Sequence, residues 1–196
     1  MTVLHETNII APTIAAAPFV IRAETGFDIA ARESLLDVCF GAARHARTCQ
    51  RLRDGRLPAE GLAFSVDHEG KLVGTIRLWH VDAGGRAALM LGPLAVDPSV
   101  RTLGIGAALM THAITEAAAR GHGAILLLGD APYYARFGFT SERMNMLALP
   151  GPFEPERLLG LELKPGALDR ARGIILPSGK RVRHTDTELT PSALAA

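Results

Sequence analysis

The sequence predicts one α/β domain built on a mixed, mostly antiparallel sheet that is flanked by helices. Residues 62–81 hold two β-rich runs around a polar turn at 67–70, which is typical of an antiparallel hairpin. Residues 86–96, 105–121 and 123–130 then read as strand, helix and buried strand, with glycines in the first connection. A strand, a helix and a strand in this order form a parallel pair with a right-handed crossover.

The remaining elements follow from local patterns. Residues 27–43 carry apolar side chains at helical spacing, and Asp28 is positioned to cap that helix. Weakly patterned residues 1–17 and polar residues 177–196 are interpreted as tails, which leaves one domain over 18–176. Further strands are predicted over residues 18–25, 139–146 and 158–165. Short helices are predicted over residues 46–56 and 132–138.

Composition excludes several classes of protein. The 196 residues are 48% hydrophobic and 21% charged, which is the composition of a globular protein with a hydrophobic core. The net charge is only +1, so a general nucleic-acid or anionic-membrane partner is not expected. Cys39 and Cys49 fit no metal-binding spacing and suit a reducing compartment, although a disulfide stays open. With no secretory signal pattern and no apolar run of about 18 residues, we expect a cytoplasmic protein without metal.

The connection from the strand at 86–96 to the next helix has the features of a phosphate site. The first turn of a helix leaves N–H groups unpaired, and Gly104 and Gly106 let an anion approach them. Arg101 adds a full positive charge. The Gly-Lys-Ser/Thr ending of the Walker A loop is absent, and the third small residue of the dinucleotide fingerprint is out of place. A pyrophosphate on another carrier is therefore expected.

Two motifs together resemble the GNAT superfamily of N-acetyltransferases. Residues 96–106, VDPSVRTLGIG, meet every specified position of the acetyl-CoA signature V-x-P-x-x-R/Q-x-x-G-x-G/A. The segment YYARFGF places Tyr134 four positions before Gly138 and Phe139, as in the second hallmark of the family. The resemblance covers about residues 18–168. Within the superfamily, the chain looks most like a bacterial branch of predicted N-acetyltransferases. The resemblance implies a GNAT-type sheet with a splayed parallel strand pair.

The resemblance also implies which residues bind acetyl-CoA. The pantetheine arm lies between the splayed strands, where it pairs with backbone groups of Leu94, Ala95 and Val96. The residues implied for the pyrophosphate are Arg101, Thr102, Leu103, Gly104, Ile105 and Gly106. The chain departs from the family pattern at Thr102 and Leu103, where many members carry a further basic residue, so one phosphate contact is in doubt.

Acetyl transfer requires a neutral amine, a stabilised oxyanion and a proton for the departing thiolate. The resemblance gives the last role to Tyr134, whose neighbour Tyr133 is expected to pack. The base stays open, because the strand at 86–96 contains no carboxylate. His80 is the leading candidate. The alternatives are Asp82, His68, Glu69 or a chain of water molecules.

The sequence therefore predicts an acetyl-CoA-dependent N-acetyltransferase that uses direct transfer to a primary amine of a small molecule or peptide. The alternatives are a non-catalytic acyl-CoA-binding sensor of the same fold and a nucleotide-binding regulator. A homodimer is left open. The arginines beside Cys49 suggest a lowered thiol pKa, but without a partner histidine we expect no cysteine nucleophile.

Overall fold

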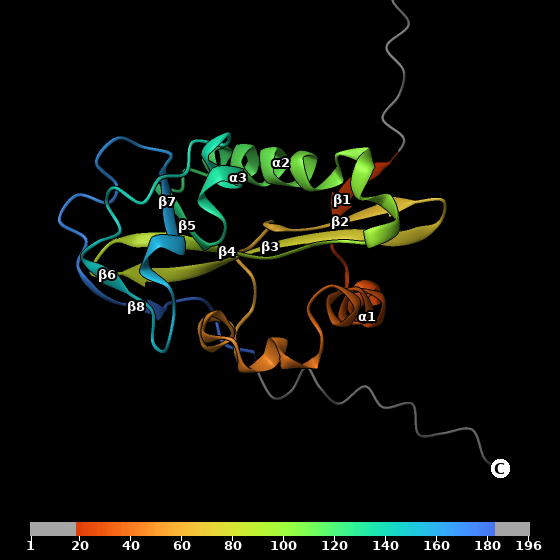
Figure 1. The fold of residues 1–196 in the computed structure, drawn as a ribbon, viewed down its shortest axis with the longest axis horizontal. Coiled ribbons are helices and arrows are strands. Elements are labelled where there is room, and N and C mark those ends of the chain that lie inside the picture. The colour runs from red at the N-terminus through yellow and green to blue at the C-terminus, as the bar shows by residue number, and fades with distance from the viewer. Residues whose placement is uncertain (1–18, 183–196) are drawn as a thin grey trace, which may run out of the picture.

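An eight-stranded sheet organises residues 19–182, which are the part of the chain that the computed structural model describes (Figure 1). Its main path runs β1-β2-β3-β4-β5-β7, and all neighbours on this path are antiparallel except β4 and β5. The strands are β1 (Val20–Ala23), β2 (Ala63–His68), β3 (Lys71–Ala83), β4 (Ala87–Val96), β5 (Ala124–Leu128), β6 (Leu147–Ala148), β7 (Leu158–Glu162) and β8 (Gly173–Pro177). The predicted tail at residues 1–17 lies outside the described residues.

Helices cover both faces of this sheet, which confirms the predicted fold class. Figure 1 shows α2 and α3 on one side of the sheet, and α1 with the adjoining 3-10 turns on the other. The helices are α1 (Ile29–Phe40), α2 (Ile105–Ala119) and α3 (Ala131–Ala135), and the 3-10 turns are η1 (Gly26–Asp28), η2 (Ala42–Ala46), η3 (Thr48–Leu52), η4 (Pro98–Leu103) and η5 (Pro155–Arg157). Within the described range, no helix is both long and apolar enough to cross a membrane.

The hairpin of β2 and β3 forms as its sequence predicts. His68 pairs with Lys71, so the connection contains only Glu69 and Gly70. Both of these residues have positive φ, at 50° and 75°, which is the backbone of a tight hairpin turn whose twist matches the strands. Glycine adopts this conformation without strain, whereas Glu69 adopts it because the strand register fixes the turn.

Alternating side chains of the central strands build two cores. On one face, Ile76 and Leu89 pack with Leu109 and Met110 of α2, and all four are fully or almost fully buried. On the opposite face, Met90 and its neighbours pack beneath η3 and the segments around β6 and β8. Because side chains of a strand alternate in direction, each residue of β3 and β4 belongs to one face, and this decides which of them reach the site.

Three local predictions differ from the structure. The helix predicted over residues 46–56 is shorter and of the 3-10 type, η3 at Thr48–Leu52, and turns follow it. Residues 141–146 form turns instead of a strand, because the backbone closes on itself from Met144 to Ser141 while the Met144 side chain is buried under β7. Asp28 occupies the N-cap position of α1, but its carboxylate accepts hydrogen bonds from Thr25 and Arg22 instead of from the helix.

The chain beyond residue 176 extends the fold, whereas the sequence predicts a tail from residue 177. β8 pairs with the part of β3 that β2 leaves uncovered, at Val81–Ala83. The backbone then continues to residue 182 along the loop that follows η3: the Leu57 amide donates to Lys180, and the Val182 amide donates to Gly55. Backbone hydrogen bonds hold this segment in place, so the polar side chains in its sequence did not indicate that it is ordered against the fold. Residues 183–196 lie outside the described range.

Candidate functional site

The parallel strands β4 and β5 separate, and the site lies where they part. Their register contains only two residue pairs, Leu89 with Ile125 and Met90 with Leu126. Beyond Met90, β4 keeps its pairing with β3 but leaves β5, and a bulge at Gly92 shifts the register. The Trp79 indole donates a 2.6 Å hydrogen bond to the Gly92 carbonyl and so ties this bulge to β3. The backbone of β4 after the bulge therefore faces a gap between strands.

A cavity of about 490 Å³, the smaller cavity, lies at the far end of β4. The lining includes seven of the nine residues predicted to bind acetyl-CoA: Leu94, Ala95, Val96, Arg101, Thr102, Gly104 and Gly106. The other two serve the core instead, because Ile105 is fully buried and Leu103 packs against the cluster under α2. Neighbouring residues of a helical turn point in different directions around its axis, so Leu103 and Ile105 face the core while Gly104 and Gly106 face the cavity.

The glycine loop has the geometry of an anion cradle. Gly104 has φ of +74° at the N-cap of α2, a left-handed conformation that glycine tolerates best. A Cβ placed on Gly106 would lie 3.4 Å from the Tyr133 hydroxyl and 3.7 Å from Val96, so it would narrow the smaller cavity. Immediately before the loop, Asp97 accepts hydrogen bonds from Ser99, and these lower the pKa of its carboxyl.

Two arginines give the smaller cavity its positive charge. Arg101 comes from η4, and Arg136 comes from the segment after α3. Neither forms an ion pair with any residue in the described range 19–182. Arg136 lies 4.1 Å from the centre of the Tyr133 ring, so a cation–π contact positions its guanidinium. The sequence analysis missed Arg136, although it lies within the YYARFGF motif; it supplies a second cation where Thr102 and Leu103 lack one.

A second and larger cavity, of about 1280 Å³, adjoins the first. Phe40, Leu94 and Tyr133 line both cavities. The larger cavity extends between the ends of β4 and β5, the 3-10 turns η2 and η3, and the loop near residues 152–157. The two cavities therefore meet beside Phe40, Leu94 and Tyr133, on the part of β4 that has left β5.

Both adjacent tyrosines reach this region, although the sequence predicts a packing role for Tyr133. The Tyr134 ring lies against Gly129, where a Cβ would collide with it, and it packs on the core cluster beneath α2. Burial raises the pKa of Tyr134, so its phenol keeps its proton at neutral pH. Tyr133 crosses it edge-on, with ring centres 4.9 Å apart, and lines both cavities.

His80, the leading base candidate from the sequence, lies away from both cavities. Its strand neighbour Trp79 lines the larger cavity, and the alternation of β3 therefore turns His80 to the opposite face. There its ring lies 5.4 Å from that of His122. Of the alternatives, Asp82 accepts a hydrogen bond from the Gly85 amide in a turn, and His68 lies at the distal end of the β2–β3 hairpin.

Asp130 is the carboxylate that the sequence analysis missed. It lies two residues after β5, at the N-cap of α3, and lines the larger cavity beside both tyrosines. Its side chain forms no hydrogen bond or ion pair within the described range 19–182, and its charge helps to raise the pKa of Tyr134. A polar residue just after the carboxyl end of a buried strand indicates a candidate site residue in the sequence, because binding sites often lie at such strand ends.

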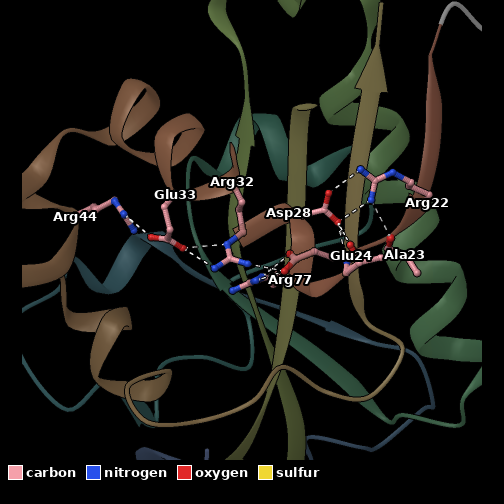
Figure 2. Close-up of polar contacts among 9 residues, drawn as sticks. Arg22, Ala23, Glu24, Asp28, Arg32, Glu33, Arg44 and Arg77 are labelled. Atoms are coloured by element: carbon pink, nitrogen blue, oxygen red, sulfur yellow. Dashed lines mark hydrogen bonds and ion pairs between the residues drawn. The ribbon is translucent and has the colours of Figure 1, made fainter. Parts of the chain in front are cut away.

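A chain of ion pairs braces α1 against the sheet beside the larger cavity (Figure 2). Arg32 of α1 donates to Glu24 at 2.6 Å and to Glu33 at 2.7 Å, and Arg44 donates to Glu33 at 2.6 Å. Arg77 of β3 donates to Glu24 as well, through Nε at 2.7 Å. Because breaking one member of a buried network leaves a charge without its partner, this chain fixes the wall firmly.

Neither cysteine has the environment of a nucleophile. Burial raises the pKa of Cys49, and this effect exceeds the opposing effects of Arg53 and Arg47, so the suggested lowering is wrong. Cys39 packs against the buried cluster that contains Leu35 and Leu36, lines the smaller cavity and donates a 3.4 Å hydrogen bond to the Val96 carbonyl. Burial raises its pKa too. Both thiols are free.

The chain is similar to known acetyltransferases in sequence and structure. Residues 59–141 match the family model of an acetyltransferase (GNAT) domain. The uncharacterized N-acetyltransferase YhbS of Escherichia coli strain K12 is 31% identical over 157 residues, which are 79% of this chain and 93% of YhbS. The structure of Escherichia coli YhbS in complex with CoA matches with a TM-score of 0.71 at 26% identity, over 86% of this chain and 94% of that one.

A second solved structure shares the fold. A GNAT family acetyltransferase from Brucella melitensis, in complex with acetyl-CoA, matches with a TM-score of 0.62 at 23% identity. The match covers 83% of this chain and 97% of that one.

Proposed function

Because the chain belongs to the GNAT superfamily of acetyltransferases, we propose that it transfers the acetyl group of acetyl-CoA directly to a primary amine of a small molecule or peptide. One observation carries this proposal: the smaller, positively charged cavity and the larger cavity meet at the splay of β4 and β5, beside Tyr133 and Tyr134. The donor occupies the first cavity and the acceptor occupies the second.

The residues of the smaller cavity suit the pyrophosphate and pantetheine of acetyl-CoA. Unpaired N–H groups at the start of α2 and the guanidinium groups of Arg101 and Arg136 attract the phosphates. The absence of a side chain at Gly106 keeps the approach open, since a Cβ there would point at Tyr133. Beyond the loop, Leu94, Ala95 and Val96 line the path along β4 that leads toward the larger cavity.

The transfer itself requires two proton movements. As the amine nitrogen bonds to the thioester carbonyl carbon, the bond from that carbon to sulfur breaks. Tyr134 donates its phenol proton to the departing sulfur, a role that its raised pKa supports because the phenol is protonated at neutral pH. Asp130 accepts the proton that the amine loses, directly or through a water molecule, because its carboxylate lines the same cavity without a partner in the described range 19–182.

Binding and turnover test the proposal separately. Isothermal titration calorimetry is expected to detect acetyl-CoA binding and no comparable binding of ATP or NAD. A spectrophotometric assay for free CoA, run over amines, amino acids, aminoglycosides and peptides, is expected to find at least one acceptor. Binding of ATP without binding of acetyl-CoA would overturn the proposal. Binding of acetyl-CoA without transfer to any amine would favour a non-catalytic acyl-CoA-binding module of the same fold.

A further inference from the structure

Most charged side chains in the wall of the larger cavity already have partners within the protein. Glu33 is engaged by Arg44 at 2.6 Å, and Arg77 is engaged by Glu24 at 2.7 Å. These charges neutralise one another and leave little to attract a ligand. The other paired carboxylates in this wall are Glu154, which lies 3.5 Å from Arg157, and Asp54, which accepts a 2.6 Å hydrogen bond from Gln50.

Two guanidinium groups in the same wall have no carboxylate partner in the described range 19–182. Arg47 lies between η2 and η3, with its Cζ atom 5.1 Å from the centre of the Phe40 ring. Arg53 follows η3, and its Nε donates a 3.1 Å hydrogen bond to the Cys49 carbonyl. This bond leaves both terminal nitrogens of Arg53 without a hydrogen-bond partner in the same range. Both residues line the larger cavity.

Arg53 lies in an environment that disfavours its charge, whereas Arg47 is exposed. Arg53 is partly buried, and burial lowers its pKa by more than the charges of Cys49 and Asp54 raise it, with smaller lowering effects from Arg44 and Arg47. A cation under such conditions is stabilised strongly when an anion binds to it, because the anion restores the interactions that water no longer supplies. The planar guanidinium group also matches carboxylate and phosphate oxygens in pairs.

We propose that Arg47 and Arg53 bind an anionic group of the acceptor, so that the acceptor is an amine that also carries a carboxylate or a phosphate. This proposal rests on the proposed function, since it names the class of acceptor that the larger cavity takes. The anion is held at the wall formed by η3, and the amine reaches the part of the cavity lined by Asp130 and Tyr134.

The charges of the cavity fit such a two-ended ligand. Asp130 is the carboxylate of this wall that has no partner in the described range 19–182, and it lines the cavity beside Tyr134. An amine approaching Tyr134 therefore meets a negative charge, whereas its anionic group meets Arg47 and Arg53. Polycationic amines, such as aminoglycosides or polyamines, would bring further positive charges to these arginines and bind poorly.

Matched pairs of acceptors test the proposal. The release of CoA is measured with amino acids and their carboxamides, and with phosphoethanolamine and ethanolamine, at saturating acetyl-CoA. The members of each pair differ in the anionic group and share the amine. We expect the anionic member to have a KM lower by about tenfold or more, the value for one charge-assisted contact. The carboxylate and phosphate arms show which anion the site takes.

Substitutions then assign the effect to the two arginines. Arg53→Gln and Arg47→Gln are expected to raise the KM of the anionic acceptor by about tenfold or more, while the KM of its neutral analogue and of acetyl-CoA stay the same. Arg47 is exposed, so its substitution carries little risk to folding. Arg51→Gln is the matched control: Arg51 lies on η3 but bonds to the Pro150 carbonyl at 2.6 Å, outside the cavity lining.

A binding measurement covers the case in which no acceptor of the panel is turned over. With CoA saturating the smaller cavity, inorganic phosphate is expected to raise the melting temperature of the protein and of Arg51→Gln at constant ionic strength, but not that of Arg53→Gln. Neutral or polycationic amines that are acetylated as well as anionic ones, or a phosphate effect that survives Arg53→Gln, would overturn this inference and leave the proposed function intact. Loss of acetyl-CoA binding itself would instead remove the proposed function.

Discussion

The Trp79 indole nitrogen donates a 2.6 Å hydrogen bond to the Gly92 carbonyl oxygen, at the bulge where β4 leaves its parallel partner. Trp79 is 6% exposed, so Trp79→Phe leaves that carbonyl without its donor and removes packing. We expect the free energy of unfolding to fall by about 1–3 kcal/mol, the usual cost of an unsatisfied buried polar group. Urea titration measures it, and an unchanged midpoint would contradict this role for the bond.

Gly106→Val is expected to weaken CoA binding in a folded protein. The new side chain would extend from a Cβ that lies 3.4 Å from the Tyr133 hydroxyl, into the space where a pyrophosphate meets the start of α2. We expect the dissociation constant to rise by about tenfold or more, which is about 1.4 kcal/mol. Calorimetry measures binding and circular dichroism checks folding. Unchanged affinity in a folded variant would place the phosphates elsewhere.

Tyr134→Phe is expected to slow acetyl transfer by about 10²-fold to 10⁴-fold while acetyl-CoA binding stays nearly the same. The hydroxyl is used as the thiolate leaves, so its removal affects the transition state more than the ground state. Tyr133→Phe is the matched control. A slow Tyr133→Phe variant beside an active Tyr134→Phe variant would move the role to Tyr133, which lines both cavities.

Asp130→Asn is expected to lower kcat/KM by about 10²-fold or more, because the amide accepts no proton from the acceptor amine. His80→Gln is expected to leave the rate unchanged, since His80 faces His122 on the other side of the sheet. A pH–rate profile of each variant separates loss of a base from a change in binding. If His80→Gln is the slow variant instead, Asp130 is not the base, and His80 acts on the amine although it does not line either cavity.

Asp28 makes the stability of the protein depend on acid. Hydrogen bonds from Arg22 and then Thr25 hold the pKa of Asp28 well below its ordinary value of 3.8. Below about pH 4, Asp28 is therefore protonated in the unfolded chain but still ionised in the folded chain. The stabilisation from Asp28 is present above this pH and is lost as the pH falls below it. Asp28→Asn is expected to flatten the decline of the melting temperature between pH 5 and pH 3. An equally steep decline would assign the acid sensitivity to other carboxylates.

The glycine loop and the hairpin were predictable from sequence because their conformations are encoded locally. Gly104 adopts the left-handed backbone that the motif requires, and Glu69 and Gly70 form the two-residue turn. Seven of the residues that line the smaller cavity follow from these patterns, whereas Arg136 and Tyr133 do not. Leu103 and Ile105 were predicted with them, but they face the core because of helical geometry.

The larger cavity was not predictable in the same way, because long-range contacts assemble it. Arg47, Arg53 and Asp130 become one wall only when η3 packs near the end of β5. His80 and Trp79 are neighbours in sequence, yet the pleat of β3 sends them to opposite faces. The side-chain chemistry of histidine made His80 a candidate base. The direction in which each side chain leaves β3 decides which residues reach the cavity, and this direction was not read from the sequence.

The return of residues 179–182 to the loop after η3 has a consequence for biosynthesis. Arg56 donates through Nη1 to the Gly179 carbonyl, 123 positions later in the chain, and Leu57 and Lys180 are joined by their backbones. During translation the segment from β4 through α2, which lines most of the smaller cavity, leaves the ribosome while these partners are still missing. Contacts between distant segments form late, because loop closure must precede them. In a nascent chain, therefore, the loop after η3 is closed only when synthesis is nearly complete, after every residue that lines the smaller cavity has been made.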